Sequence, residues 1–124
     1  SELASEKIWS KIVAEHDALW STDDKNGTVK AFCCFNSNAR DFARLGKLVL
    51  QNGRWDSTQI VPAAYVKEAT SAASWLKDDE GKPVDFYGYQ FWITERKGMK
   101  IPYFRGVLVH AFLMNGIYWL PCLM

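Results

Sequence analysis

The sequence lacks a charge excess of either sign. It has 15 lysines and arginines against 14 aspartates and glutamates, a net charge of +1, and the cations are scattered along the chain. A nucleic-acid partner or an anionic membrane surface calls for clustered positive charge, so we expect neither. Hydrophobic residues make up 48% of the 124 residues and charged residues 23%. This composition excludes a disordered chain and predicts a single globular domain.

Cysteine and histidine are scarce, with three and two copies. Cys33 and Cys34 are adjacent, and Cys122 stands far along the chain. Adjacent cysteines rarely bridge each other, because disulfide geometry needs separated Cα atoms. There is no CxxC and no Cys/His cluster at zinc spacing, so we expect no metal site and no cofactor. The cysteines are predicted to be small buried hydrophobes.

A signal-peptide pattern is also missing, and the sequence begins at Ser1 rather than at Met. We expect either a processed protein or a sequence that begins within a longer one. Residues 106–124 carry no charge, and the run is long enough to span a bilayer. Asn115-Gly116 and Pro121 interrupt it, however. A hairpin of buried strands is therefore favoured over a membrane anchor.

Hydrophobic periodicity predicts helices in the first half of the chain. Residues 2–14 have the pattern of an amphipathic helix. A clearer helix begins after Asn38, a good N-cap, with Asp41 in a capping-box-like position. Asn52-Gly53 is expected to end that helix. Its predicted apolar stripe consists of Phe42, Leu45, Leu48 and Val49.

Strand-type sequence dominates the second half. A further helix is expected from Pro62, and the charged residues 77–85 are expected to form a loop. Residues 86–94 are rich in β-formers, and residues 103–114 and 117–123 are apolar runs separated by Asn115-Gly116. Nearer the N-terminus, residues 22–27 are predicted to form a turn and residues 28–35 a strand or extended segment. Helices followed by strands predict an α+β fold with an antiparallel sheet.

Several segments resemble β-lactamase-related serine hydrolases, the class that includes penicillin-binding proteins. Residues 38–46 read Asn-Ala-Arg-Asp-Phe-Ala-Arg-Leu-Gly and are followed by Asn52-Gly53, Trp55 and Ile-Val-Pro at residues 60–62. Residues 87–92 read Tyr-Gly-Tyr-Gln-Phe-Trp. These motifs resemble, in order and spacing, a stretch common in that family. Residues 6–9 and 15–20 resemble segments of its 6-aminohexanoate-oligomer hydrolase branch.

The resemblance covers residues 2–106 and implies a partial β-lactamase/transpeptidase-like fold. It also implies acyl transfer on small amide or ester substrates, in which a serine of Ser-x-x-Lys attacks a carbonyl and the lysine and a Tyr-x-Asn tyrosine help to remove its proton. A periplasmic or secreted bacterial location is suggested by the resemblance alone.

The sequence departs from the family at each of the catalytic motifs. Tyr-x-Asn, Lys-Thr-Gly and His-Ser-Gly are all missing. In the family, Ser-x-x-Lys and Tyr-x-Asn precede the segment that residues 2–9 match. After Gly106 the sequence also leaves the family pattern. We therefore expect residues 1–124 to be the C-terminal part of a larger hydrolase domain, with no catalytic residue and no activity alone.

Tyr87, Tyr89, Trp92 and His110 are the candidate substrate-binding residues. The resemblance places the tyrosines and Trp92 at a substrate cleft, and core packing is an equal alternative. Alternation along a strand would put Tyr87 and Tyr89 on one face and Trp92 on the other. His110 lies in an apolar run and is either a core histidine or a residue at the edge of the site. Aromatic residues amount to 15% with six Trp, which suits a pocket or a core.

The remaining reactive residues have simpler interpretations. Ser74 and Lys77 form a literal Ser-x-x-Lys, but an acidic run follows that would keep the lysine charged and solvated. His16 is expected to be a surface or capping histidine. Asp23 and Asp24 are expected to be solvated loop charges. The alternative to a hydrolase part is a non-catalytic binding module with an aromatic-lined surface. Open strand edges further predict a homo-oligomer.

Overall fold

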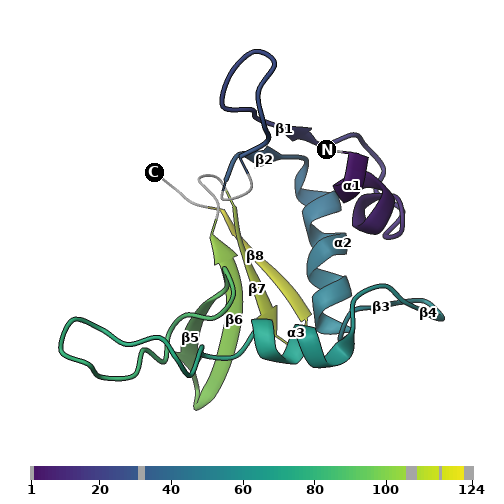
Figure 1. Ribbon diagram of the computed structural model, residues 1–124. Coiled ribbons are helices and arrows are strands. Elements are labelled where there is room, and N and C mark those ends of the chain that lie inside the picture. The colour runs from purple at the N-terminus through teal and green to yellow at the C-terminus, as the bar shows by residue number, and fades with distance from the viewer. Residues whose placement is uncertain (1, 31–32, 106–108, 115, 122–124) are drawn as a thin grey trace.

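The computed structural model describes residues 2–30, 33–105, 109–114 and 116–121, with side chains described for residues 2–30 and 33–103. Helices and antiparallel strands are both present, so the fold is α+β (Figure 1). The helical elements are α1 (Glu2–Ala4), the π-helical turn η1 (Ser5–Trp9), α2 (Ala39–Leu50) and α3 (Ala63–Ala69). The strands are β1 (Leu19–Trp20), β2 (Phe35–Asn36), β3 (Arg54–Trp55), β4 (Thr58–Gln59), β5 (Trp92–Arg96), β6 (Met99–Arg105), β7 (Val109–Met114) and β8 (Gly116–Pro121).

The main sheet has the strand order β5-β6-β7-β8, and all neighbours are antiparallel. Helix α2 lies against β7 and β8, so a helix and a sheet form two layers (Figure 1). Strands β5 and β8 are the two edges of the sheet. The pairs β1–β2 and β3–β4 are short antiparallel ribbons outside it.

The predicted hairpin near the end of the chain is confirmed. Strands β7 and β8 pair in register from Val109↔Pro121 to Met114↔Gly116. The expected continuous run 103–114 is divided between the end of β6 and β7, which pair with each other from Tyr103↔Phe112 to Arg105↔His110. The two long apolar stretches thus become neighbouring strands of one sheet.

A second hairpin, between β5 and β6, has no counterpart in the sequence prediction. Arg96 pairs with Met99, which leaves Lys97 and Gly98 as a two-residue loop. Both loop residues have positive φ, 50° and 73°, as a type I′ turn requires. Lysine rarely adopts this conformation, so Lys-Gly gives a much weaker turn signal than Asn-Gly.

The prediction of a strand over residues 86–94 is wrong for its first part. The chain bends at residues 88–91, where the Gly88 amide donates to the Phe91 carbonyl (2.8 Å) and Gln90 has φ 65°. Strand β5 begins only at Trp92. Tyr87 pairs with Trp92 as an isolated bridge across the bend. Strand propensity alone does not detect the turn, because the aromatic residues on both sides of it favour strands equally.

Helix α2 begins and ends as predicted. The Asn38 side chain accepts a hydrogen bond from the Asp41 amide (2.9 Å). At the other end, the Gly53 amide donates to the Leu48 carbonyl (2.8 Å) and the Asn52 amide to the Val49 carbonyl (3.0 Å), the paired bonds of a Schellman motif. A Cβ on Gly53 would lie 2.1 Å from the Val61 carbonyl oxygen, so this position requires glycine.

The best-defined hydrophobic core joins the N-terminal segment, α2 and β3. Its buried centre consists of Ile12, Leu48 and Trp55, and the Lys47 ammonium lies 4.7 Å from the Trp55 ring centre. Partly buried hydrophobic residues surround this centre: Ile8, Trp9, Ala14, Leu45, Ile60 and Val61. The predicted stripe of α2 is therefore correct at Leu48. The prediction of one continuous helix over 2–14 is wrong, because α1 and η1 together end at Trp9. Hydrogen-bonded turns continue to Ala14, but Val13 has φ 55°.

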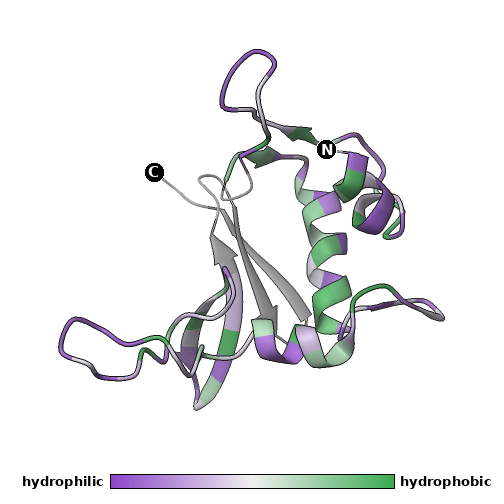
Figure 2. Ribbon diagram, in the orientation of Figure 1, coloured by the Kyte–Doolittle hydropathy of each residue, from purple (hydrophilic) through white to green (hydrophobic). Residues whose placement is uncertain are grey.

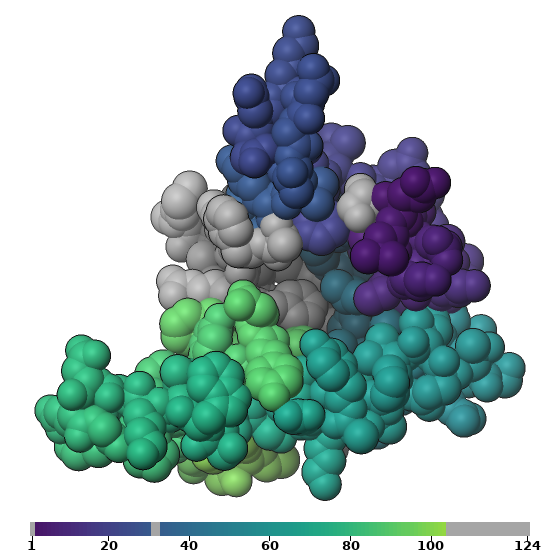
Figure 3. Space-filling model, viewed as in Figure 1, coloured from purple at the N-terminus to yellow at the C-terminus, as the bar shows by residue number. Residues whose placement is uncertain are grey.

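Helix α3 begins directly after Pro62, as predicted, and buries Val66 and Ala69. The predicted loop at 77–85 is closed by a bridge between Lys77 and Pro83. Hydrophilic residues concentrate in this loop and in the excursion between β1 and β2 (Figure 2). That excursion, which includes the predicted turn at 22–27, projects from the body of the molecule (Figure 3). No helix within the described ranges is long and apolar enough to cross a membrane.

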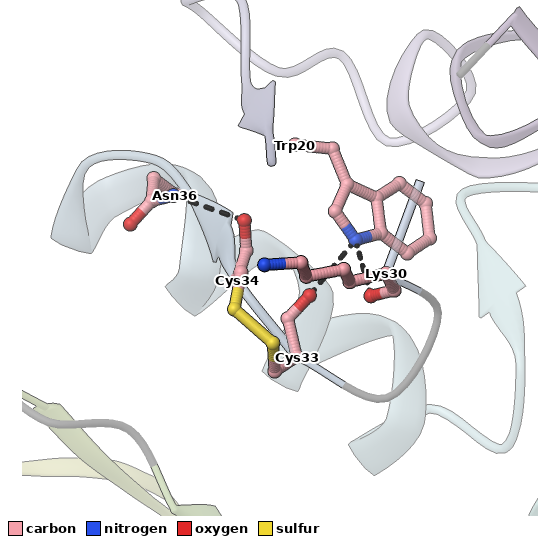
Figure 4. Close-up of a disulfide and its surroundings, with 5 residues drawn as sticks. All are labelled: Trp20, Lys30, Cys33, Cys34 and Asn36. Atoms are coloured by element: carbon pink, nitrogen blue, oxygen red, sulfur yellow. Dashed lines mark hydrogen bonds between the residues drawn. A yellow bond between two sulfur atoms is a disulfide. The ribbon is translucent and has the colours of Figure 1, made fainter. Parts of the chain in front are cut away.

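The prediction that adjacent cysteines do not bridge is wrong. Cys33 and Cys34 form a disulfide, with their Cα atoms 3.8 Å apart (Figure 4). Cys33 is half-buried and Cys34 is exposed, so neither is a buried hydrophobe. The pair lies where the excursion returns to β2. Of the strand or extended segment predicted at 28–35, the described residues include a bridge at Val29 and the start of β2. Cys122 lies outside the described residues.

Candidate functional site

Two of the predicted substrate-binding residues lie together where the chain enters β5. The Tyr87 and Trp92 rings meet edge to face, with centroids 5.1 Å apart. Phe86 stacks on Trp92 at 6.3 Å and an interplanar angle of 15°. We call Phe86, Tyr87 and Trp92 the edge cluster. The expectation that Tyr87 and Trp92 lie on opposite faces is wrong, because the bend at 88–91 folds Tyr87 back onto Trp92.

The edge cluster is accessible to solvent. Phe86 is 52% exposed and Trp92 36% exposed, while Tyr87 is half-buried. The next residue of the edge strand, Ile93, is only 7% exposed, and its amide donates to the Phe86 carbonyl (2.7 Å). The exposed rings are therefore held by a buried, hydrogen-bonded backbone. Their faces offer stacking surface to a planar or apolar group.

Tyr89, the third aromatic candidate, belongs to a separate group that we call the Tyr89 group, with Tyr65, Glu68 and Trp75. Its hydroxyl donates to a Glu68 carboxylate oxygen (2.7 Å), and its ring lies 6.2 Å from that of Tyr65. The hydrogen bond to Glu68 raises the pKa of Tyr89; burial and the negative charge of Glu68 act in the same direction, and Trp75 opposes them. Tyr89 is thus kept protonated and acts as a hydrogen-bond donor.

Gly88 separates the two aromatic groups and fixes their positions. A Cβ at this residue would lie 2.5 Å from both the Ala69 and the Ser71 carbonyl oxygens. The neighbouring Tyr89 amide donates to the Ala69 carbonyl, and the Tyr87 carbonyl accepts from the Ala73 amide, both at 3.0 Å. The bend is therefore tied to the end of α3, and only glycine allows this close approach.

His110 lies at a distance from the edge cluster. It is a residue of β7 and pairs with Arg105 of β6 and Leu120 of β8. Trp92 pairs with Tyr103, and Tyr103 with Phe112. His110 is thus two strands and two residues away, a backbone separation of roughly 12 Å from standard strand spacings. The His110 side chain lies outside the described residues.

Ser74 and Lys77 do not have the geometry of a Ser-x-x-Lys nucleophile. They lie in a turn after α3 rather than on a helix, and both are exposed. Lys77 is part of the bridge that closes the 77–85 loop. The helical spacing that brings a lysine amine to a serine hydroxyl is therefore missing at this position.

A buried carboxylate that sequence reasoning treated only as part of a helix cap is the centre of a polar network. Asp41 is fully buried and accepts hydrogen bonds from the backbone amides of Glu15 (2.8 Å) and His16 (3.1 Å) and from the Asn38 side chain (2.7 Å). Burial by itself raises the pKa of Asp41, but these hydrogen bonds and the nearby His16 outweigh it and lower that pKa. The network connects the N-terminal segment to α2, so we interpret Asp41 as structural.

The other candidates have local roles. His16 is an exposed side chain that lies 3.0 Å from the Asn38 amide nitrogen, in agreement with the expected capping position. Asp23 accepts from the Thr28 amide and Asp24 from the Lys25 amide, both at 2.7 Å, so each organises the turn of the excursion. Among the residues with described placement, no group of three His, Cys, Asp or Glu side chains could hold a metal ion.

Neither the protein-family models nor the curated proteins compared with the chain give a match. The site is therefore defined by its geometry: an exposed aromatic cluster on a rigid bend at the edge of an antiparallel sheet.

Proposed function

We propose that the chain is the substrate-side part of a β-lactamase-related serine hydrolase. In this proposal it supplies an aromatic wall for an amide or ester substrate, and the serine nucleophile and its base belong to other segments of the hydrolase. The edge cluster is the observation that carries the proposal. It combines exposed stacking surface with a backbone fixed at Gly88 and Ile93, which is how a binding wall is kept in one shape.

The order of the elements supports the same assignment. The resemblance to this family rests on the α2 helix, the Asn-Gly turn, the helix after Pro62 and the Tyr-Gly-Tyr segment. In the structure these segments form α2 with its Schellman motif, then α3, then the bend that leads into the sheet. A helix packed on an antiparallel sheet is compatible with that family's architecture, and Ser74 and Lys77 are placed as loop residues rather than as a catalytic pair.

Ligand-observed NMR tests the aromatic wall directly. The linear dimer of 6-aminohexanoate and benzylpenicillin serve as probes, each titrated against the full chain. Both a planar amide and an apolar chain should stack on the edge cluster, so Trp92→Ala should weaken binding by about tenfold, equivalent to about 1.4 kcal/mol. Trp75→Ala is the matched control, because Trp75 is 67% exposed and outside the edge cluster.

The outcomes separate the proposal from its rivals. Binding that Trp92→Ala removes and Trp75→Ala preserves supports it. No binding of either probe, or equal binding by wild type and Trp92→Ala, contradicts it. The chain should also hydrolyse neither benzylpenicillin nor a p-nitrophenyl ester above background, since Ser74 and Lys77 lie in an exposed turn without the helical spacing of a nucleophile and its base. Turnover that Ser74→Ala abolishes would overturn the assignment of Ser74 as a loop residue.

A second candidate function, a non-catalytic binding module, is favoured by one specific observation. In the Tyr89 group, Tyr65 is 54% exposed and Trp75 67% exposed, beside the Glu68 carboxylate. Aromatic surface next to an acidic group suits a ligand with both apolar and donor groups. Probe binding that is lost in Trp75→Ala and kept in Trp92→Ala would favour this function over the hydrolase part.

A further inference from the structure

The Cys33–Cys34 disulfide joins two neighbouring residues at an accessible position. Cys34 is exposed and Cys33 half-buried, so the pair lies at the surface, with Cys34 the more exposed residue. Cys34 also has φ 70°, a left-handed conformation that costs free energy for a residue with a Cβ. Disulfides that are exposed and held in unfavourable backbone are the labile ones, in contrast to buried structural bridges.

The two cysteine carbonyls are points of attachment for the β1–β2 ribbon. The Cys33 carbonyl accepts from the Trp20 indole (2.9 Å), which also donates to the Lys30 carbonyl (2.9 Å) (Figure 4). The Cys34 carbonyl accepts from the Ser21 amide (3.1 Å) and the Asn36 side chain (3.0 Å). The Cys33 carbonyl belongs to the peptide group inside the ring that the disulfide closes, and the Cys34 carbonyl is attached to that ring at the Cys34 Cα.

Phe35, the residue after Cys34, connects the backbone at the disulfide to a group of packed aromatic rings. Phe35 meets Trp20 and Trp9 edge to face, with centroids 5.3 and 5.0 Å apart. It also contacts Phe42 of α2 at 6.1 Å. A change in the backbone at Cys34 would thus be transmitted to the N-terminal segment and to the first turns of α2 through one shared ring.

We propose that Cys33–Cys34 is a site of reversible thiol–disulfide exchange with small-molecule thiols, and that its redox state sets the packing of the β1–β2 ribbon. A thiolate attacks the exposed Cys34 sulfur and forms a mixed disulfide, and the Cys33 thiolate leaves and takes up a proton. A second thiolate then attacks the sulfur of the bound small molecule and releases Cys34 as a thiol. Two small thiols are oxidised to one disulfide, and the protein disulfide is reduced by two electrons.

Alkylation and mass spectrometry test the exchange on the folded chain. The experiment uses Cys122→Ser protein, so that only Cys33 and Cys34 carry thiols. The protein is equilibrated in glutathione buffers of different ratio without denaturant, alkylated with iodoacetamide and digested with trypsin. The peptide 31–40 should gain two labels in reducing buffer and none in oxidising buffer, and reoxidation should restore the unlabelled form. A peptide that is labelled only after unfolding in urea, or that carries two free thiols in every buffer, overturns the proposal.

Tryptophan fluorescence tests the structural consequence. Reduction should change the emission of the Cys122→Ser protein. That change should be smaller in Trp20→Phe, where only Trp9 still contacts Phe35, and absent in the Cys33→Ser/Cys34→Ser variant. Trp75→Phe is the matched control, since this exposed tryptophan is outside the ribbon. An emission spectrum and a urea midpoint that are identical in both redox states would contradict the coupling to the ribbon, even where exchange itself occurs. Neither result depends on the proposed hydrolase function.

Discussion

Among individual residues, Asp41 connects the N-terminal segment to α2 through one carboxylate. Its carboxylate is fully buried yet accepts from two backbone amides of the N-terminal segment and from the Asn38 side chain. Charge-assisted hydrogen bonds of this kind are stronger than neutral ones. One side chain therefore holds together residues far apart in sequence, and the cap of α2 is part of the same network.

Asp41→Asn should destabilise the chain by about 2–4 kcal/mol, because its amide nitrogen would face backbone donors and leave them unpaired. The folded-state pKa of Asp41 is below its ordinary value of 3.8. The stability that its charge contributes is therefore complete above about pH 5 and is lost as the pH falls below the ordinary pKa and then through the lower folded pKa. Urea denaturation at several pH values measures both effects. Wild-type stability should fall more steeply than that of Asp41→Asn in acid; parallel curves would contradict the assigned role.

Among the elements, α2 organises the best-defined core. Leu48 is 2% exposed and contacts the cluster around Ile12 and Trp55, whereas Leu50, two residues later, is 40% exposed. Leu48→Ala should cost about 2–5 kcal/mol through lost burial and the cavity left behind. Leu50→Ala is the matched control and should cost less than 1 kcal/mol, within the small effects usual at exposed sites. Equal urea midpoints for the two variants would show that the helix is rotated.

The β5–β6 hairpin allows a stabilising change. Lys97 has φ 50° in the two-residue loop, where asparagine is better tolerated than lysine. Lys97→Asn should raise the free energy of unfolding by about 0.5–1 kcal/mol, in the range of backbone substitutions that suit their conformation. Lys97→Ala, which also has a Cβ but no side-chain amide, should not stabilise. Thermal denaturation of both variants measures the difference, and equal midpoints would contradict a type I′ turn.

The elements also show how far local sequence determines structure here. Helix α2 is predictable because its cap, apolar spacing and Asn-Gly terminus all favour the same boundaries. The structure of residues 86–94 is not predictable in this way, because the bend at Gly88 depends on its close approach to the Ala69 and Ser71 carbonyls. These two residues belong to another part of the chain. For the same reason, the alternation of side chains along a strand does not predict the contact between Tyr87 and Trp92. The vicinal disulfide is likewise missed, because a rule based on typical Cα separations excludes it.

For the whole molecule, the sheet edges bear on association. Strands β5 and β8 each have one neighbour in the sheet. The outer side of β5 is already paired in part, because Trp92 bridges Tyr87 and the Ile93 amide donates to the Phe86 carbonyl. The exposed rings of Phe86 and Trp92 lie at the β5 edge. We predict a two-fold dimer through these exposed aromatic faces. Sedimentation velocity at micromolar concentration should show it, and Trp92→Lys should weaken it; a monomer at every concentration contradicts the prediction.

If the chain is the substrate-side part of a serine hydrolase, as we propose, it belongs to a larger protein. The most direct test is the sequence of the coding DNA upstream of the Ser1 codon. We expect one continuous reading frame that contains a Ser-x-x-Lys motif followed by Tyr-x-Asn, both before the segment that resembles the family at residues 6–9. A reading frame that lacks both motifs would contradict the claim and favour the binding module.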